Sequence, residues 1–122
     1  MKKNDLKKQF QDESEKMKKF HIVSIQAQLD YENAKDNHNP ELDKYETILK
    51  KAEQEEDSYS DLYAKKIFDY LKNIKPVLIR KRSNQKVSWD EAFGTDFSKL
   101  SNEVKGSLVA LVEEDGGQYR LA

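Results

Sequence analysis

The stretch "KDNHNPELD", residues 35–43, decides the fold because it divides a long run of helix-favouring sequence into two segments. Asn39 is a preferred helix N-cap, and Pro40 suits the first helical position, where its missing N–H is not needed. Glu41 and Asp43 complement the positive end of a helix that begins here. Two segments of similar length on either side of a tight turn predict an antiparallel helical hairpin.

The segment before this turn carries a heptad pattern of apolar residues. Alternating steps of four and three from Leu6 reach nine positions, of which seven are apolar or aromatic. These positions are Leu6, Phe10, Glu13, Met17, Phe20, Ser24, Ala27, Tyr31 and Ala34. The pattern predicts a helix over about residues 4–37.

A strand is the alternative for part of this segment. From Val23 to Tyr31, apolar and polar residues alternate as they do in a half-buried strand. The helix is favoured because Gln, Ala, Leu, Glu and Lys dominate the segment and no Gly or Pro bounds it.

The second segment predicts a helix over about residues 40–74. Leu42, Tyr45, Leu49 and Ala52 continue a seam at helical spacing. The acidic run from Glu53 to Asp57 interrupts the apolar pattern, so a kink near residue 57 is expected, with Ser58 or Ser60 capping a separate helix. Pro76 ends the segment.

Residues 75–122 predict a small helical unit that packs on the helix at 59–74. A basic connector comes first, and "SWDE" follows as a capping box in which Ser88 begins a short helix that stops at Gly94. Phe97, Leu100, Val104, Leu108 and Leu111 lie at the spacing of one further helix. Its end has two interpretations. Either the helix continues to a cap at Gly116, or Leu108–Val112 pairs with Gln118–Leu121 in a terminal β-hairpin.

The predicted fold class is therefore mainly α. In its order of elements, the region from Tyr59 to Ala122 resembles a winged helix. The resemblance implies a surface for protein contact rather than DNA, because Glu113, Glu114 and Asp115 stand at the presumed wing and repel phosphate.

Composition narrows the class of protein. Apolar residues make up 36% of the chain and charged residues 37%, which suits helices with narrow apolar seams. The formal net charge of −1 argues against a binder of polyanions through overall charge. The chain has no cysteine, no apolar secretory region and no run long enough to span a membrane, so we expect a soluble cytoplasmic protein.

One stretch separates the charges. Between Tyr70 and Trp89 there is no Asp or Glu, and residues 75–86 carry five positive charges. Four of them, Arg80, Lys81, Arg82 and Lys86, are the candidate contacts to nucleic-acid phosphate. The favoured interpretation is instead an exposed loop or edge strand protected by charge.

Catalytic, metal and cofactor sites are not expected. The acidic run at 53–57 lacks the glycine-centred ligand spacing of a calcium loop. His21 and His38 lie on different predicted elements without the partners of a catalytic triad. We therefore expect no enzyme, no cofactor and no small-molecule substrate.

The aromatic residues of the second helix suggest a function. Tyr45, Tyr59 and Leu49 lie on one helical face, and tyrosine is enriched at protein interfaces. We expect a non-enzymatic interaction module or adaptor that binds another protein or itself through the hairpin, with a small C-terminal contact surface. The alternative is a nucleic-acid-associated accessory factor in replication, transcription or mobile-element regulation that uses the basic stretch.

Overall fold

The computed structural model describes residues 3–113 and 116–122. It is mainly helical, at 73% helix, with a small antiparallel sheet of three strands, as the predicted fold class requires. The contacts divide the chain into two compact units. One joins residues 1–14 to residues 61–122, and the other is the continuous segment Glu15–Ser60.

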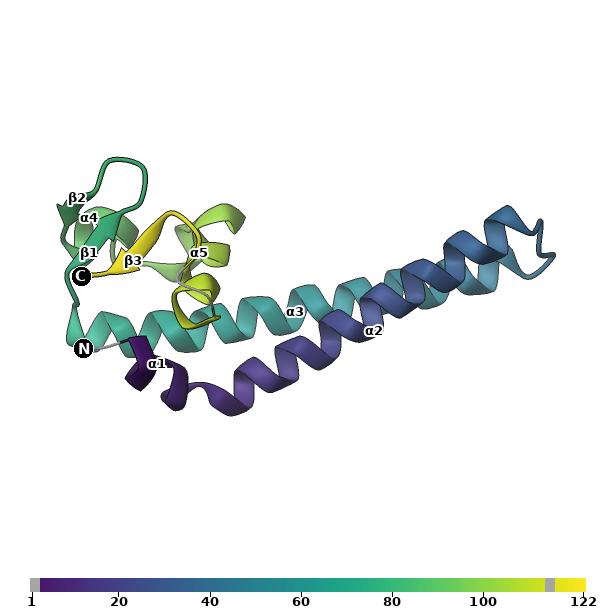
Figure 1. Ribbon diagram of the computed structural model, residues 1–122, viewed down its shortest axis with the longest axis horizontal. Coiled ribbons are helices and arrows are strands. Elements are labelled where there is room, and N and C mark those ends of the chain that lie inside the picture. The colour runs from purple at the N-terminus through teal and green to yellow at the C-terminus, as the bar shows by residue number, and fades with distance from the viewer. Residues whose placement is uncertain (1–2, 114–115) are drawn as a thin grey trace. The chain divides into compact units, whose positions relative to one another are not determined.

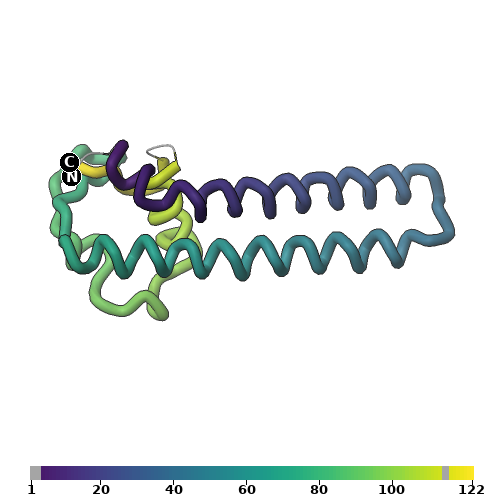
Figure 2. Tube along the Cα trace, turned by 90° about the horizontal axis from the view of Figure 1, so that it is seen from below, coloured from purple at the N-terminus to yellow at the C-terminus, as the bar shows by residue number. Residues whose placement is uncertain are grey.

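The unit of residues 15–60 is a pair of antiparallel helices. It contains most of α2 (Gln11–Asp36) and the first half of α3 (Leu42–Ile74), which run side by side in Figure 2. In the turn between them, His38 has a positive φ of 51°. The Oδ1 atom of Asn39 accepts the backbone N–H of Glu41 at 2.8 Å, which is the capping role predicted for this residue.

The two helices meet along a seam of small and aromatic side chains. Ala27, Leu49 and Ala52 are buried together, and Tyr31 packs against them. Phe20 and Tyr59 stack with ring centroids 5.0 Å apart. Small residues at such a contact allow two helices to pack closely, because little side-chain volume separates the backbones.

The predicted heptad pattern is confirmed by burial. All nine of its positions are buried or half-buried. In a strand, Val23, Ile25 and Leu29 would lie on the same face as Ala27 and Tyr31. In the structure these three side chains are about half exposed, whereas Ala27 is buried. The strand alternative is therefore wrong, because the 3.6-residue period places these side chains on other faces of a helix.

The helix boundaries differ from prediction in two places. The first helix is interrupted at Phe10, which separates α1 (Lys3–Gln9) from α2 and packs edge-on against Tyr70 at 5.6 Å. By contrast, α3 is unbroken through Asp57. Neither Ser58 nor Ser60 begins a separate helix there, because both lie within α3.

The sheet belongs to the other unit. Its strands are β1 (Leu78–Arg80), β2 (Gln85–Val87) and β3 (Tyr119–Leu121), in the order β2-β1-β3 (Figure 1). The stretch predicted as a basic connector is thus mostly a β-hairpin. Leu78 and Ile79 supply β-favouring side chains, and Asn84 takes the positive φ of 53° in the turn, which Asn tolerates well.

Of the two helices predicted to follow, the first has its expected bounds and the second is divided. In α4 (Trp89–Phe93), Ser88 Oγ accepts the Glu91 N–H at 3.2 Å, and Gly94 forms the C-cap with a φ of 69°, as expected. The single helix predicted from Phe97 is divided into the 3₁₀ turn η1 (Phe97–Lys99) and α5 (Asn102–Glu113). Asp96 caps η1, and hydrogen bonds from Ser98 lower the pKa of the Asp96 carboxyl.

The predicted terminal β-hairpin is wrong. Leu108–Val112 lies within α5, and β3 pairs instead with β1, with Leu121 opposite Leu78 and Tyr119 opposite Arg80. Glu114 and Asp115, which the predicted turn included, lie outside the described residues.

The core of this unit is aromatic. Ring contacts connect α3 to the C-terminal elements through Phe68, Trp89, Phe93 and Tyr119, with centroids 4.5–5.5 Å apart. A polar cluster adjoins the core: Ser14 Oγ and Tyr63 OH both donate to Glu113 Oε1, at 2.5 and 3.1 Å. α2, α3 and α5 each contribute one residue to this cluster.

Candidate interaction surfaces

The sheet places positive charges from distant parts of the sequence together. The register sets Lys86 opposite Ile79 on one side and Arg120 opposite Ile79 on the other, so these three residues form one row across the strands. Leu78, Val87 and Tyr119 are buried on the opposite face. Because side chains alternate along a strand, the row of Ile79, Lys86 and Arg120 points away from the core.

The turn of the hairpin extends this charge. Lys81 and Arg82 follow Arg80 at the end of β1, and all three side chains are exposed. We call Lys81, Arg82, Lys86 and Arg120 the cationic face. Within residues 3–113 and 116–122, none of the four forms an ion pair with a carboxylate. Three of the four were predicted as candidates, and the structure adds Arg120. The fourth predicted candidate, Arg80, is paired with Tyr119 and so lies on the other side of the sheet from Lys86 and Arg120.

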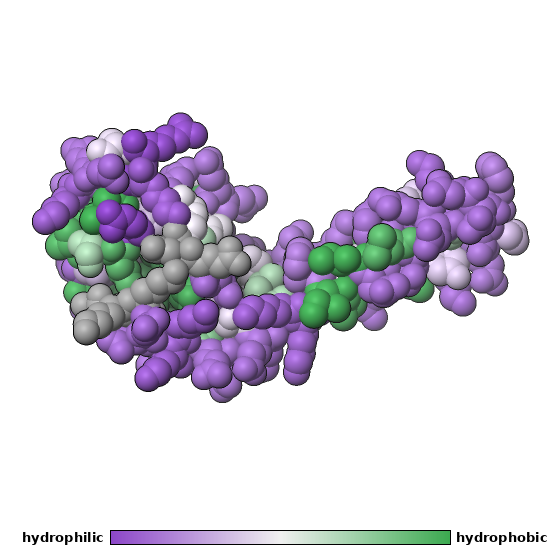
Figure 3. Space-filling model, in the orientation of Figure 1, coloured by the Kyte–Doolittle hydropathy of each residue, from purple (hydrophilic) through white to green (hydrophobic). Residues whose placement is uncertain are grey.

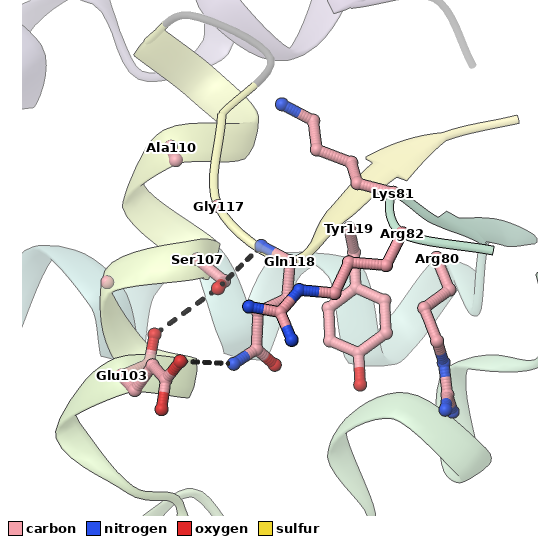
Figure 4. Close-up of a pocket in the computed structure, with 10 residues that line it drawn as sticks. Arg80, Lys81, Arg82, Glu103, Ser107, Ala110, Gly117, Gln118 and Tyr119 are labelled. Atoms are coloured by element: carbon pink, nitrogen blue, oxygen red, sulfur yellow. Dashed lines mark hydrogen bonds between the residues drawn. The ribbon is translucent and has the colours of Figure 1, made fainter. Parts of the chain in front are cut away.

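A pocket of about 630 Å³ lies beside the turn. Figure 4 shows Arg80, Lys81 and Arg82 around one side of it, and Glu103, Ser107 and Ala110 of α5 on the other. A volume of this size is within the range of small-ligand sites. Three cations and two neutral polar side chains line it, with Glu103 as the one carboxylate among its described residues.

Local hydrogen bonds hold the wall of this pocket in place. Ser107 Oγ accepts the Gln118 N–H at 3.0 Å and donates to the Glu103 carbonyl at 3.2 Å. Gly117 precedes Gln118 with a φ of 70°, and a Cβ atom there would lie 2.7 Å from Ser107 Cα. Only glycine fits this approach, and it brings the chain from α5 into β3.

Glu103 is engaged within the same wall. Its Oε1 accepts the Gln118 Nε2 group at 2.7 Å, so its charge is directed toward an amide rather than toward the cations. The carboxylate still lowers the positive potential of the pocket. An anion in the pocket would therefore be attracted by Arg80, Lys81 and Arg82 and opposed by Glu103.

The predicted protein-interface residues are mostly occupied by the hairpin itself. Leu49 is 8% exposed in the seam against Ala27, and Tyr59 stacks on Phe20. Tyr45 is half-buried. The seam pattern that identified these residues is the one that joins α2 to α3. The predicted interface role of Leu49 is thus not supported, because its side chain is already covered.

Other apolar side chains of the helical pair are exposed instead. The aliphatic stripe, which we define as Ile22, Ile25 and Leu29, is exposed at 65%, 48% and 49%. Figure 3 shows hydrophobic surface interrupting the hydrophilic surface of this pair near its middle. An adjoining groove of about 490 Å³ is lined by Phe20, Val23 and Tyr59 with the charged Lys16, Lys19 and Glu55.

The remaining polar candidates form local contacts. His21 Nδ1 lies 2.8 Å from Glu56 Oε1 across the helical pair, and His38 is exposed in the turn. Among the described residues, no three His, Asp or Glu side chains are arranged to hold a metal ion. A search of the described helices finds none with the length and apolar character of a membrane span.

Comparison with known proteins gives no family for this chain. No family model, curated protein or solved structure matches it.

Proposed function

We propose that the chain is a non-enzymatic cytoplasmic module that binds the phosphate backbone of nucleic acid through the cationic face. One observation carries the proposal. Pairing of β3 with β1 adds Arg120 to the three cations of the hairpin that belong to this face, on strands that contain no carboxylate. Each cation without an ionic partner can neutralise one phosphate and release its counterion.

The composition of the face favours a duplex over a single strand. Single-strand binding uses exposed aromatic side chains on which bases stack. The outward row of the sheet carries Ile79 between Lys86 and Arg120, and Tyr119 is only 7% exposed. A duplex offers closely spaced phosphates and requires no stacking platform.

The winged-helix resemblance takes a different form in this proposal. The predicted wing at the C-terminus was acidic, whereas the turn between β1 and β2 presents Lys81 and Arg82. In our proposal this basic turn acts as the wing, and it contacts the phosphate backbone of the duplex beside a groove.

Salt dependence tests the proposal directly. We expect a fluorescently labelled duplex to bind with a slope of log K against log salt no steeper than about −3.6, because the four cations of the face contribute about −0.9 each. Arg120→Gln should reduce the magnitude of the slope by about 0.9 and weaken binding to unrelated sequences equally.

The control removes the same charge from elsewhere in this unit. Lys65 is exposed on α3 outside the cationic face, so Lys65→Gln should leave the slope unchanged. Equal slopes for wild type and Arg120→Gln, or equal effects of Arg120→Gln and Lys65→Gln, would show that the face does not bind phosphate.

A second candidate function is a protein-interaction module that acts through the helical pair. The exposed aliphatic stripe favours it, since large apolar side chains grouped on one helix face are typical of interaction sites.

A further inference from the structure

The aliphatic stripe occupies a face of α2 that the helical pair leaves uncovered. At 100° per residue, Ile22, Ile25 and Leu29 fall within an arc of about 60°. The seam positions Ser24, Ala27 and Tyr31 are centred on roughly the opposite side of the same helix. α3 therefore covers the seam and leaves the stripe at 48–65% exposure.

The spacing of the stripe is the spacing of a helix-pairing surface. Ile22, Ile25 and Leu29 stand at i, i+3 and i+7, which is the repeat that two α-helices use when they pack along their length. α2 thus carries two heptad-related rows, one inside the pair and one outside. The inner row is rich in small residues, and the outer row consists of large aliphatic ones.

Charges at the two ends of the stripe indicate what covers it. Residues 15–19 carry three lysines and one glutamate, a net of +2, whereas residues 30–36 carry three acids and one lysine, a net of −2. Two copies of α2 placed antiparallel would set each basic end beside the acidic end of the other copy. A parallel arrangement would set like charges together.

We propose that the stripe pairs with the stripe of a second copy of this chain in an antiparallel, two-fold arrangement. This inference identifies the partner of the second candidate function and is independent of nucleic-acid binding. A two-fold axis between Ile25 and Gln26 places Ile22 beside Leu29 of the other copy. The same axis places Lys18 on the same flank of the contact as the other copy's Glu32, within about one residue along the helix.

The expected dimer is weak. The stripe consists of only three side chains, so pairing removes limited apolar area from water, while association carries a fixed entropic cost. We expect a dissociation constant roughly in the micromolar to millimolar range. Charge complementarity then contributes mainly to the orientation and specificity of pairing.

Sedimentation equilibrium over a range of protein concentrations measures the association. Ile25→Ser should weaken dimerisation by about tenfold or more, because it removes a large side chain from each copy at the centre of the contact. Ile48→Ser is the matched control, since Ile48 has the same 48% exposure but lies on α3. Circular dichroism checks that both variants keep the helical content of wild type.

Charge exchange tests the orientation. Lys18→Glu and Glu32→Lys should each weaken the dimer, and the double variant should restore it, because only antiparallel pairing sets these two positions together. The chain has no cysteine, so single cysteines report the register. Gln26→Cys should crosslink between copies with a short dithiol-reactive reagent. Asn33→Cys should not, because its two copies lie about 22 Å apart along the axis.

A monomer at every concentration would overturn the inference. So would equal effects of Ile25→Ser and Ile48→Ser, failure of the double exchange to restore pairing, or efficient crosslinking of Asn33→Cys. If the protein binds duplex but stays monomeric, the proposed function of the cationic face stands and only the self-pairing inference fails. Failure of self-pairing and failure of polyanion binding are thus observed separately.

Discussion

Replacing Tyr63 with phenylalanine tests the polar cluster that joins α2, α3 and α5. The Tyr63 side chain is 0% exposed, and its hydroxyl donates to Glu113 Oε1 at 3.1 Å. Burial, followed by the negative charge of Glu113, raises the pKa of Tyr63 well above its ordinary value of 10.0. The folded protein therefore holds the phenolic proton more tightly than the unfolded chain does.

The expected magnitude follows from this difference in proton binding. At about pH 8 both states keep the proton, and Tyr63→Phe should cost about 1.5–3 kcal/mol, because it removes a hydrogen bond to a charged group. Above pH 10 the unfolded chain releases the proton while the folded protein keeps it, so wild type loses stability as pH rises. At about pH 11 this loss is about 1.4 kcal/mol, and the variant does not share it.

Urea unfolding followed by far-ultraviolet circular dichroism measures the free energy of unfolding at both pH values. The difference in the free energy of unfolding between wild type and Tyr63→Phe should be smaller by about 1.4 kcal/mol at the higher pH. Tyr70→Phe is the control, since the Tyr70 hydroxyl donates to no described carboxylate. A difference that stays constant from pH 8 to pH 11 would refute the assigned role of burial and of Glu113.

Four further predictions concern single positions. Ser24→Ala should raise the free energy of unfolding by about 1 kcal/mol in urea titration, because the buried Ser24 hydroxyl has no hydrogen-bond partner among the described residues. Gly117→Ala should lower the melting temperature and cost more than about 1 kcal/mol, since it combines a positive φ with a contact to Ser107. Ser88→Ala should cost about 1 kcal/mol through loss of the α4 cap. Glu103→Gln should strengthen duplex binding in the anisotropy titration, because it removes a carboxylate from the pocket.

The helical pair was predictable because its determinants are local. The heptad positions and the Asn39 cap each depend on residues within one or two turns, and helix periodicity fixes which side chains share a face. Periodicity does not indicate which other helix, strand or protein packs against a given face. Tyr59 and Leu49 were therefore predicted as an outer interface, although they form the seam between α2 and α3.

The sheet was not predictable to the same degree because its pairing is non-local. Arg120 reaches the cationic face only when β3 pairs with β1, about 40 residues earlier in the chain. A signal was present in "YRL", residues 119–121, where an arginine alternates with Tyr and Leu as in a half-buried strand.

Gly106 explains why the terminal hairpin was a reasonable but wrong alternative. Glycine in a helix costs about 1 kcal/mol relative to alanine, which lowered the preference for helix over residues 102–113. In the structure Gly106 is exposed, with open space around the position of a Cβ atom. Burial of Leu108, Leu111 and Val112 on the opposite side of α5 outweighs the glycine penalty, because each such side chain contributes about 1.5–3 kcal/mol.

Net charge was a poor guide to the cationic face because the two units differ in sign. Residues 1–14 with 61–122 contain fifteen Lys and Arg against twelve Asp and Glu, a net of +3, whereas residues 15–60 contain seven against eleven, a net of −4. The total of −1 conceals this division. At physiological ionic strength the Debye length is about 8 Å, so a phosphate at the outward row of the sheet responds mainly to Lys86, Arg120 and their immediate neighbours. Local charge without ionic partners, rather than the sum over the chain, therefore decides whether a polyanion binds.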